Sequence, residues 1–124
     1  MKDSIIIILI IVIVIIGNII SQNILKKDSE EIIANLEKLK QQIEKQENLK
    51  ENAEEIYNQW EETDEKWSII VTHQELDQIK KAITSVKSGI ESNDLSFAYQ
   101  QIENSIFLVS HIKEKEALSW KNIF

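Results

Sequence analysis

The sequence LKENAEEIYNQWEETDEKWSII (residues 49–70) carries apolar side chains at alternating intervals of four and three residues. This spacing places one face of an α-helix against neighbouring helices, as in coiled coils and antiparallel bundles. The segment therefore predicts an amphipathic helix with both of its tryptophans on the buried face. Its seam consists of Leu49, Ala53, Ile56, Trp60, Thr63, Trp67 and Ile70.

Three other segments show the same alternation, and the chain has no proline and only two glycines. Turn-rich β architectures need more of both residues, so the sequence predicts an all-α fold. We expect a small antiparallel bundle over residues 28–113. The further seams are Ile32, Leu36, Leu39 and Ile43; Leu76, Ile79, Ile83, Val86 and Ile90; and Leu95, Ala98, Ile102, Ser105, Val109 and Ile112, with Phe97, Ile106, Phe107 and Leu108 widening the last.

Capping signals mark two of the predicted helix starts. Residues 72–75, Thr-His-Gln-Glu, form a capping box, and Val71 and Leu76 stand where a hydrophobic staple requires them. Residues 28–31, Asp-Ser-Glu-Glu, give a similar signal for the first bundle helix. Ser92-Asn93-Asp94 suits a turn, because Asn tolerates a left-handed conformation and Asp caps the helix that follows.

The break at residues 46–48 has the weakest signal. Positions 39, 46, 53, 60 and 67 share one heptad phase, so one long helix over residues 28–71 followed by a hairpin is an open alternative. The apolar phase nevertheless slips by one residue between Ile43 and Leu49, and residues 43–48 resemble residues 90–95. These two observations favour two helical hairpins.

An uninterrupted apolar segment precedes the bundle. Residues 5–16 read IIIILIIVIVII and are apolar on every face, unlike a soluble core helix. The run to Ile20 is slightly shorter than the roughly 20 residues that cross a bilayer, and local thinning can absorb the difference. A cleaved signal peptide is the alternative, but no A-x-A-like site follows. We predict a transmembrane anchor at residues 1–22 that inserts residues 5–20, and a linker at residues 23–27.

The charges beside this anchor do not fix its orientation. Lys2 and the α-amine lie on one side, and Lys26 and Lys27 lie on the other. The short basic start resembles a signal-anchor, so we expect a single-pass protein of the cell membrane with an extracytoplasmic domain. Alternating helix directions then place the junction of the second and third bundle helices at the membrane-proximal end, together with the C-terminal tail.

The C-terminal tail is unusual because large apolar residues close an acidic chain. With the last helix ending near Ile112, residues 114–124 are predicted to pack across the membrane-proximal end of the bundle. Insertion into the membrane interface or capture by a partner are the alternatives. The candidate interaction residues are Trp120, Ile123, Phe124 and Trp67.

The composition excludes several kinds of chemistry. The chain has no cysteine, which removes disulfides, thiolate metal sites and Cys nucleophiles. Its net charge of −7 repels phosphate backbones, so we expect no nucleic-acid partner. The paired acids at residues 61–62 and 64–65 fall on solvent positions, where general acid–base catalysis has no support. We expect neither enzymatic activity nor a cofactor.

The two histidines are the remaining candidates for a site. His73 and His111 should lie near one end of the bundle, and with Glu75 they can assemble a metal site. However, Glu75 is accounted for by the capping box, and His111 suits a helix C-terminus. We therefore predict no metal site and keep the three residues as weak candidates for one; the histidine pair is also a candidate pH sensor.

Several stretches together resemble the domain of unknown function 4363 family. They are the Ile-rich anchor, the W-x6-W pair Trp60 and Trp67, the block WSIIVTHQELDQI (67–79) and the ending HIKEKEALSWKNIF (111–124). The resemblance covers nearly the whole chain, and the H-x-E-x-D block and the terminal N-I-F are its most specific parts. This chain has Asn48-Leu49 where an aromatic residue often follows the first seam in the family.

The resemblance implies a short, N-terminally anchored bacterial protein and brings no established activity. It also implies an accessory role beside multi-spanning membrane proteins. The leading expectation is a membrane-anchored helical module that binds a membrane-protein partner. The alternatives are a His-based metal or pH sensor and an anchored coiled-coil spacer or homo-oligomer.

Overall fold

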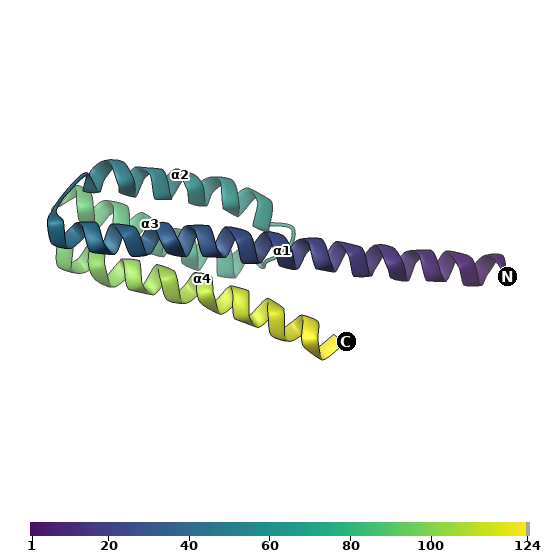
Figure 1. Cartoon of the computed structure of the whole chain (residues 1–124). Coiled ribbons are helices and arrows are strands. Elements are labelled where there is room, and N and C mark those ends of the chain that lie inside the picture. The colour runs from purple at the N-terminus through teal and green to yellow at the C-terminus, as the bar shows by residue number, and fades with distance from the viewer. Residues whose placement is uncertain (124) are drawn as a thin grey trace.

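A computed structural model describes the backbone of residues 1–123 and the side chains of residues 1–116. The chain forms four helices: α1 (Lys2–Lys45), α2 (Leu49–Trp67), α3 (His73–Glu91) and α4 (Leu95–Ile123). Helix α1 packs against α2 and α4, and α3 packs against the same two helices. Figure 1 shows the resulting antiparallel bundle, from which the first half of α1 projects. The predicted all-α fold of two helical hairpins is confirmed.

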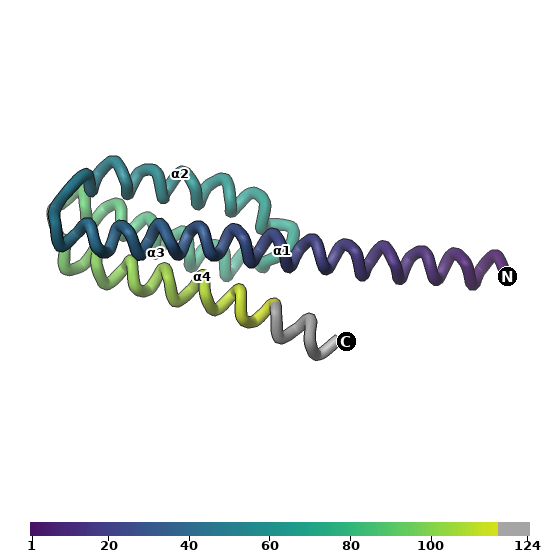
Figure 2. The backbone as a smooth tube through the Cα atoms, viewed as in Figure 1, coloured from purple at the N-terminus to yellow at the C-terminus, as the bar shows by residue number. Residues whose placement is uncertain are grey.

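Helix α1 runs without a break from the apolar segment into the bundle (Figure 2). It is helical through residues 23–27, so continuous helix takes the place of the linker expected there. No glycine or proline interrupts this stretch, and Leu25 is buried at 1% exposure. Asp28 consequently lies inside a helix, and its predicted role as a helix cap is wrong.

The turn between α1 and α2 is made by two left-handed residues. Gln46 has φ 54° and ψ 38°, and Asn48 has φ 52° and ψ 32°. This geometry ends α1 at Lys45 and excludes one continuous helix over residues 28–71. A left-handed conformation brings the Cβ atom of glutamine close to the following carbonyl oxygen, which costs about 1–2 kcal/mol.

Replacing Gln46 with glycine is expected to raise the free energy of unfolding by about 0.5–1 kcal/mol. Glycine relieves the left-handed strain at the helix C-terminus but adds entropy to the unfolded chain. Urea titration followed by circular dichroism in detergent micelles measures the change. The matched control is Lys45→Gly, one residue earlier, which is helical and should lose about 1 kcal/mol. Equal losses in both variants would contradict the prediction.

The connection between α2 and α3 follows the predicted capping signals. The Thr72 hydroxyl accepts a hydrogen bond from the Glu75 backbone N–H at 3.4 Å. Val71 and Leu76 are both buried, as a hydrophobic staple requires. The carboxylate of Glu75 does not complete the capping box and instead pairs with Lys115 of α4.

The turn between α3 and α4 also matches its prediction. Asn93 is left-handed with φ 60°, and Asp94 Oδ1 accepts a hydrogen bond from the Phe97 N–H at 3.3 Å. The two helices come close together just beyond this turn. An ideal Cβ atom placed on Gly89 would lie 3.1 Å from the Ala98 Cβ and 3.2 Å from the Ala98 Cα.

The predicted seams form one continuous core. Trp60 and Trp67 are fully buried, and their rings meet edge to face with centroids 5.8 Å apart. Two seam positions are hydroxyls, and both bond to the carbonyl four residues earlier: Thr63 to Gln59 and Ser105 to Gln101. Core packing is therefore the role of both tryptophans.

The two hairpins repeat one another in an approximate two-fold arrangement. The ammonium of Lys40 on α1 lies 5.8 Å from the ring centroid of Tyr99 on α4. The ammonium of Lys87 on α3 lies 4.6 Å from the ring centroid of Tyr57 on α2. Exchanging α1 with α3 and α2 with α4 interconverts these cation–π contacts. The weak sequence echo between residues 43–48 and 90–95 thus has a counterpart in the packing.

Helix α4 continues to Ile123, well beyond the end expected near Ile112. Residues 113–123 contain no glycine or proline to stop the helix. The carbonyl of Glu116 accepts a hydrogen bond from Gln22 Nε2 of α1 at 3.3 Å, so α1 and α4 pair beyond the core. The side chains of Trp120 and Ile123, and all of Phe124, lie outside the described residues.

Candidate functional site

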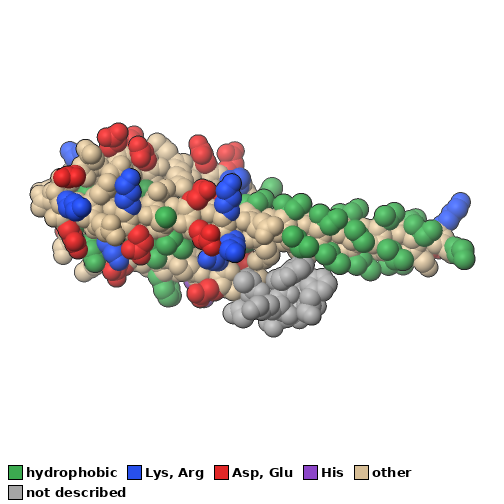
Figure 3. Space-filling model, viewed as in Figure 1, with side chains coloured by type: hydrophobic (Ala, Val, Ile, Leu, Met, Phe, Trp, Pro, Cys, Tyr) green, Lys and Arg blue, Asp and Glu red, His purple; other side chains and the backbone are tan. Residues whose placement is uncertain are grey.

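The projecting half of α1 is the most apolar surface of the described chain. Most of its side chains from Ile5 to Ile20 are exposed, and charged side chains of both signs are spread over the face of the bundle seen in Figure 3. In the described residues, α1 is the one helix long and apolar enough to cross a membrane, and its apolar window is not buried at all. It is therefore a candidate membrane span by length and composition.

A buried polar network joins α2 to α1 just after the apolar segment of α1 ends. The Asp28 carboxylate is 7% exposed and accepts a hydrogen bond from Trp67 Nε1 at 3.2 Å. The Lys66 ammonium lies 3.1 Å from the same oxygen, Oδ2. A buried carboxylate needs this combination of a charged partner and a hydrogen-bond donor. The network ties the end of α2 to α1 at the level where the bundle begins.

A second acid–lysine pair lies at the same end of the other hairpin. Lys115 of α4 bonds to Glu75 of α3, which raises the pKa of Lys115 above its ordinary value of 10.5. This pair takes Glu75 out of the metal site suggested by the sequence. His111 stacks on Phe107 of its own helix with ring centroids 6.1 Å apart. Among the described side chains, no group of three or more His, Asp and Glu residues is arranged to hold a metal ion.

His73 is the first residue of α3, and it borders an open hollow lined by acidic side chains of α2. The hollow has a volume of about 460 Å³. One of its acids, Glu61, pairs with Lys80 of α3 at 3.6 Å. A general acid would need burial in an apolar pocket to raise its pKa, and these carboxylates face an open surface. The lining residues are Glu61, Glu62, Asp64, Glu65, Ser68 and His73.

Glu116 is a carboxyl with a perturbed ionisation at the end of the bundle from which the apolar half of α1 projects. Burial raises its pKa above the ordinary value of 4.5; the nearby Lys115 lowers it, and Glu75 raises it further. A raised pKa in the folded state means that the ionised form is less stable there than in the unfolded chain. The charge on Glu116 therefore opposes folding at neutral pH.

Replacing Glu116 with glutamine is expected to stabilise the bundle slightly at pH 7, by less than about 1 kcal/mol because solvent screens the group. The penalty is fully present above the folded pKa and disappears below pH 4.5, so the difference should vanish on acidification. Thermal melts at pH 4 and pH 7 measure it. Glu114→Gln, at an exposed position two residues earlier, is the control. A stability gain that is unchanged at pH 4 would contradict the assignment.

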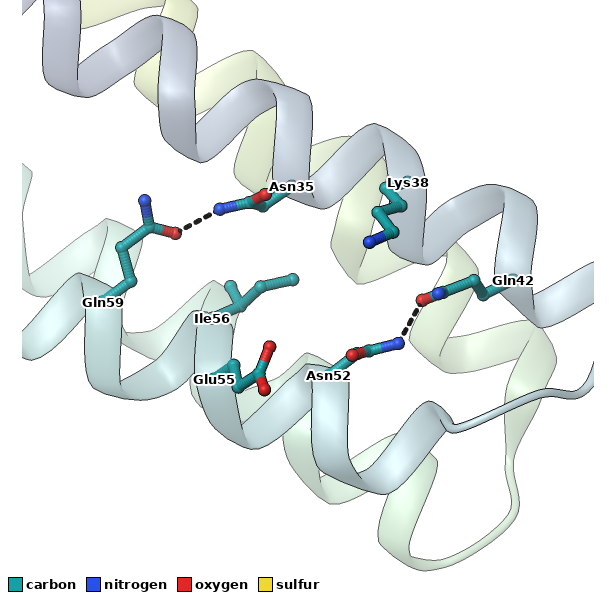
Figure 4. A pocket seen from close by; sticks show the side chains of 7 residues that line it. All are labelled: Asn35, Lys38, Gln42, Asn52, Glu55, Ile56 and Gln59. Atoms are coloured by element: carbon teal, nitrogen blue, oxygen red, sulfur yellow. Dashed lines mark hydrogen bonds between the residues drawn. The ribbon is translucent and has the colours of Figure 1, made fainter.

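A polar groove between α1 and α2 was not predicted from the sequence. Asn35 donates to Gln59 at 2.9 Å, and Asn52 donates to Gln42 at 2.6 Å (Figure 4). Each helix carries the pair as Asn-x6-Gln, so the antiparallel arrangement brings each Asn to the other helix's Gln. This repeated spacing was the signal available in the sequence.

The two amide pairs frame a small cavity of about 150 Å³. Lys38 and Glu55 enter it from opposite helices, and buried Ile56 forms part of its lining (Figure 4). The two amide pairs, one exposed and one partly buried, match the register of α1 on α2. Because its charged residues are exposed and the groove is small, we assign it a structural role.

The outer face of α4 carries an exposed aromatic side chain. Phe107 is 66% exposed and Phe97 is 39% exposed, so their predicted place in the apolar seam is wrong. The core side of α4 is filled by the smaller residues Ala98, Ile102 and Ser105. Phe107 and Ile106 border a groove of about 260 Å³ between α4 and α1. Glu37, Lys40 and Glu103 supply its charged walls.

The comparisons with known proteins give a family but no activity. A family model described as "Domain of unknown function (DUF4363)" matches residues 19–123. No curated protein and no solved structure matches the chain. The family match begins at the end of the apolar segment and covers the whole bundle.

Proposed function

The chain belongs to the domain of unknown function 4363 family, and we propose that it is a membrane-anchored helical module that binds a membrane protein. The carrying observation is the continuity of α1, whose first half is exposed and apolar and whose second half is built into the bundle core. Burying the apolar half in water-free surroundings would remove the largest unfavourable surface of the molecule. The proposal assigns the chain a binding role and no catalytic step.

A rigid connection restricts where such a module can act. Leu25 is already in the core five residues after Ile20, so no flexible segment separates the span from the bundle. The bundle is then held at the bilayer surface, and its partners are proteins that reach that surface. We propose a multi-spanning membrane protein as the partner and place the bundle outside the cytoplasm.

The surface that supports partner binding is the Phe107 face of α4. Phe107 is exposed and lies beside a groove lined by acidic and basic side chains. Protein interfaces commonly combine a large aromatic side chain at the centre with polar contacts around it. Because the Phe107 side chain is exposed and lies outside the core, substituting it should change partner binding and leave folding intact.

Site-specific photo-crosslinking in intact membranes tests the proposal. A photoreactive residue at Phe107 is expected to give a discrete product with another membrane protein. The control is the same residue at Asn58, which is exposed on α2. A product at Phe107 that contains only this chain would favour the oligomer alternative, and the absence of any product would contradict the proposal.

The orientation is tested by thiol labelling in whole cells. The chain has no cysteine, so Glu47→Cys in the turn between α1 and α2 gives a single reactive site. A membrane-impermeant reagent is expected to modify it without lysis. Modification only after lysis would place the bundle in the cytoplasm and contradict this part of the proposal.

A further inference from the structure

The connection between α2 and α3 carries the most exposed isoleucine of the described chain. Ile69 is 90% exposed, whereas the exposed large apolar side chains between Ile5 and Ile20, which are all of them except Ile15, are 44–67% exposed. Trp67 and Val71, two residues before and after it, are buried at 0% and 5% exposure. An isolated exposed isoleucine is ordinary, but this one is held away from the core by the backbone.

The turn that presents Ile69 is tightly hydrogen-bonded. The N–H groups of Ile70 and Val71 both donate to the Trp67 carbonyl at 2.8 Å. Trp67 is in turn held to α1 through its hydrogen bond to Asp28. The position of Ile69 is therefore set by the bundle framework.

The three connections between helices differ in chemistry according to the end on which they lie. The α1–α2 and α3–α4 turns lie at the end distant from the projecting half of α1, and the α2–α3 connection lies at the near end (Figure 1). The distant turns are polar: residues 46–48 are Gln-Glu-Asn and residues 92–94 are Ser-Asn-Asp. Of the three, the connection at the near end alone exposes a large apolar side chain.

With α1 inserted, the helix geometry brings this connection close to the lipid headgroups. Trp67, two residues before Ile69, bonds to Asp28 of α1, which follows Ile20 by about 12 Å at the helical rise. The polar layer on each side of a bilayer is about 5–8 Å thick. The 16 residues from Ile5 to Ile20 span about 24 Å, less than a hydrocarbon core of about 30 Å, and this mismatch draws the bundle end inward.

We propose that Ile69 is a second membrane contact, which inserts from the α2–α3 connection into the interface of the bilayer that α1 spans. The inference rests on the proposed anchor. The charges beside the connection are paired, Lys66 with Asp28 and Lys115 with Glu75, so we assign the contact to the apolar side chain of Ile69. With two attachment points, α1 and Ile69, the bundle cannot rotate freely about the axis of α1 at the membrane surface.

The test uses full-length single-cysteine variants labelled with an environment-sensitive fluorophore and reconstituted in phosphatidylcholine vesicles. Ile69→Cys probes the contact, Ile13→Cys reports insertion of α1, and Glu47→Cys marks the distant turn. With nitroxides on the lipid headgroups and at both shallow and deep positions of the acyl chains, labels at residues 13 and 69 should lose most of their emission. The label at residue 47 should keep it.

The pattern of quenching separates this inference from the anchor proposal. Quenching at residue 13 without quenching at residue 69 overturns the Ile69 contact and leaves the anchor standing. No quenching at residue 13 overturns both. Quenching at all three positions also overturns the inference, because the bundle would then lie flat on the membrane.

A second pair of variants tests the isoleucine side chain itself. A label on Ser68→Cys, an exposed neighbour, is compared with Ile69 intact and with Ile69→Asp. The aspartate should move the label emission to longer wavelength and reduce its quenching severalfold, because a charged side chain leaves the interface. Circular dichroism should be unchanged, since Ile69 is outside the core. Equal quenching in both backgrounds overturns the proposal.

Discussion

Replacing Trp67 with phenylalanine is expected to lower the free energy of unfolding by about 1–3 kcal/mol more than the same replacement at Trp60. Both rings are fully buried on α2, seven residues apart and in contact with each other. The two tryptophans differ in whether the indole N–H has a hydrogen-bond acceptor. Trp67 donates to the buried Asp28 carboxylate, whereas the buried Trp60 N–H has no acceptor among the described residues. The two substitutions remove similar apolar area, so their difference isolates the hydrogen bond.

Urea titrations in detergent micelles measure this difference, and a double-mutant cycle assigns it. Asp28→Asn alone should be destabilising, because Lys66 loses its charge partner. The two losses should be less than additive in the Trp67→Phe, Asp28→Asn double variant, because both act on one contact. Equal costs at Trp60 and Trp67 would show that the hydrogen bond contributes nothing to folding.

Replacing Gly89 with valine is expected to destabilise the bundle by about 1–3 kcal/mol through overpacking. The new side chain would meet Ala98, which has no rotamer to change, so α3 and α4 must separate. Phe97 Cδ1 also lies 3.1 Å from the ideal Cβ position, but this half-exposed ring can turn away. Alanine at the same position should cost less, because the gain in helix propensity of about 1 kcal/mol opposes the clash.

The other glycine of the chain provides the control. An ideal Cβ on Gly17 has nothing within 4 Å, so Gly17→Ala should leave the free energy of unfolding unchanged or slightly raised. Both glycines are helical, and the comparison therefore separates crowding from helix propensity. A tolerated valine at Gly89 would mean that the α3–α4 spacing is set elsewhere in the bundle.

Local sequence signals predicted the helices and two of their connections accurately. The capping of α3 by Thr72 and the left-handed Asn93 depend on interactions within a few residues, which the sequence displays directly. The heptad alternation of α2 likewise shows in the sequence which of its residues are buried. The choice of two hairpins was correct because the phase slip between Ile43 and Leu49 coincides with the left-handed residues of the turn.

The errors concern residues whose partners are distant in the sequence. Residues 28–31 match the sequence pattern of a helix cap, but the Asp28 carboxylate accepts a hydrogen bond from Trp67, 39 residues away. A linker was expected at residues 23–27, before Asp28, whereas α1 is helical there and Leu25 is buried in the core. Phe107 fitted a widened apolar seam, yet the core side of α4 is already filled by smaller residues.

The sequence by itself determined the all-α class, the apolar N-terminal segment, the positions of the core seams and the family, because periodicity and composition record them residue by residue. Only the tertiary structure decided which surfaces meet at the end of the bundle beside that segment. It brought Asp28 to Trp67 and Glu75 to Lys115, and it left Ile69 exposed at the end where the apolar half of α1 begins. These placements depend on how the four helices align against one another, which no local pattern records.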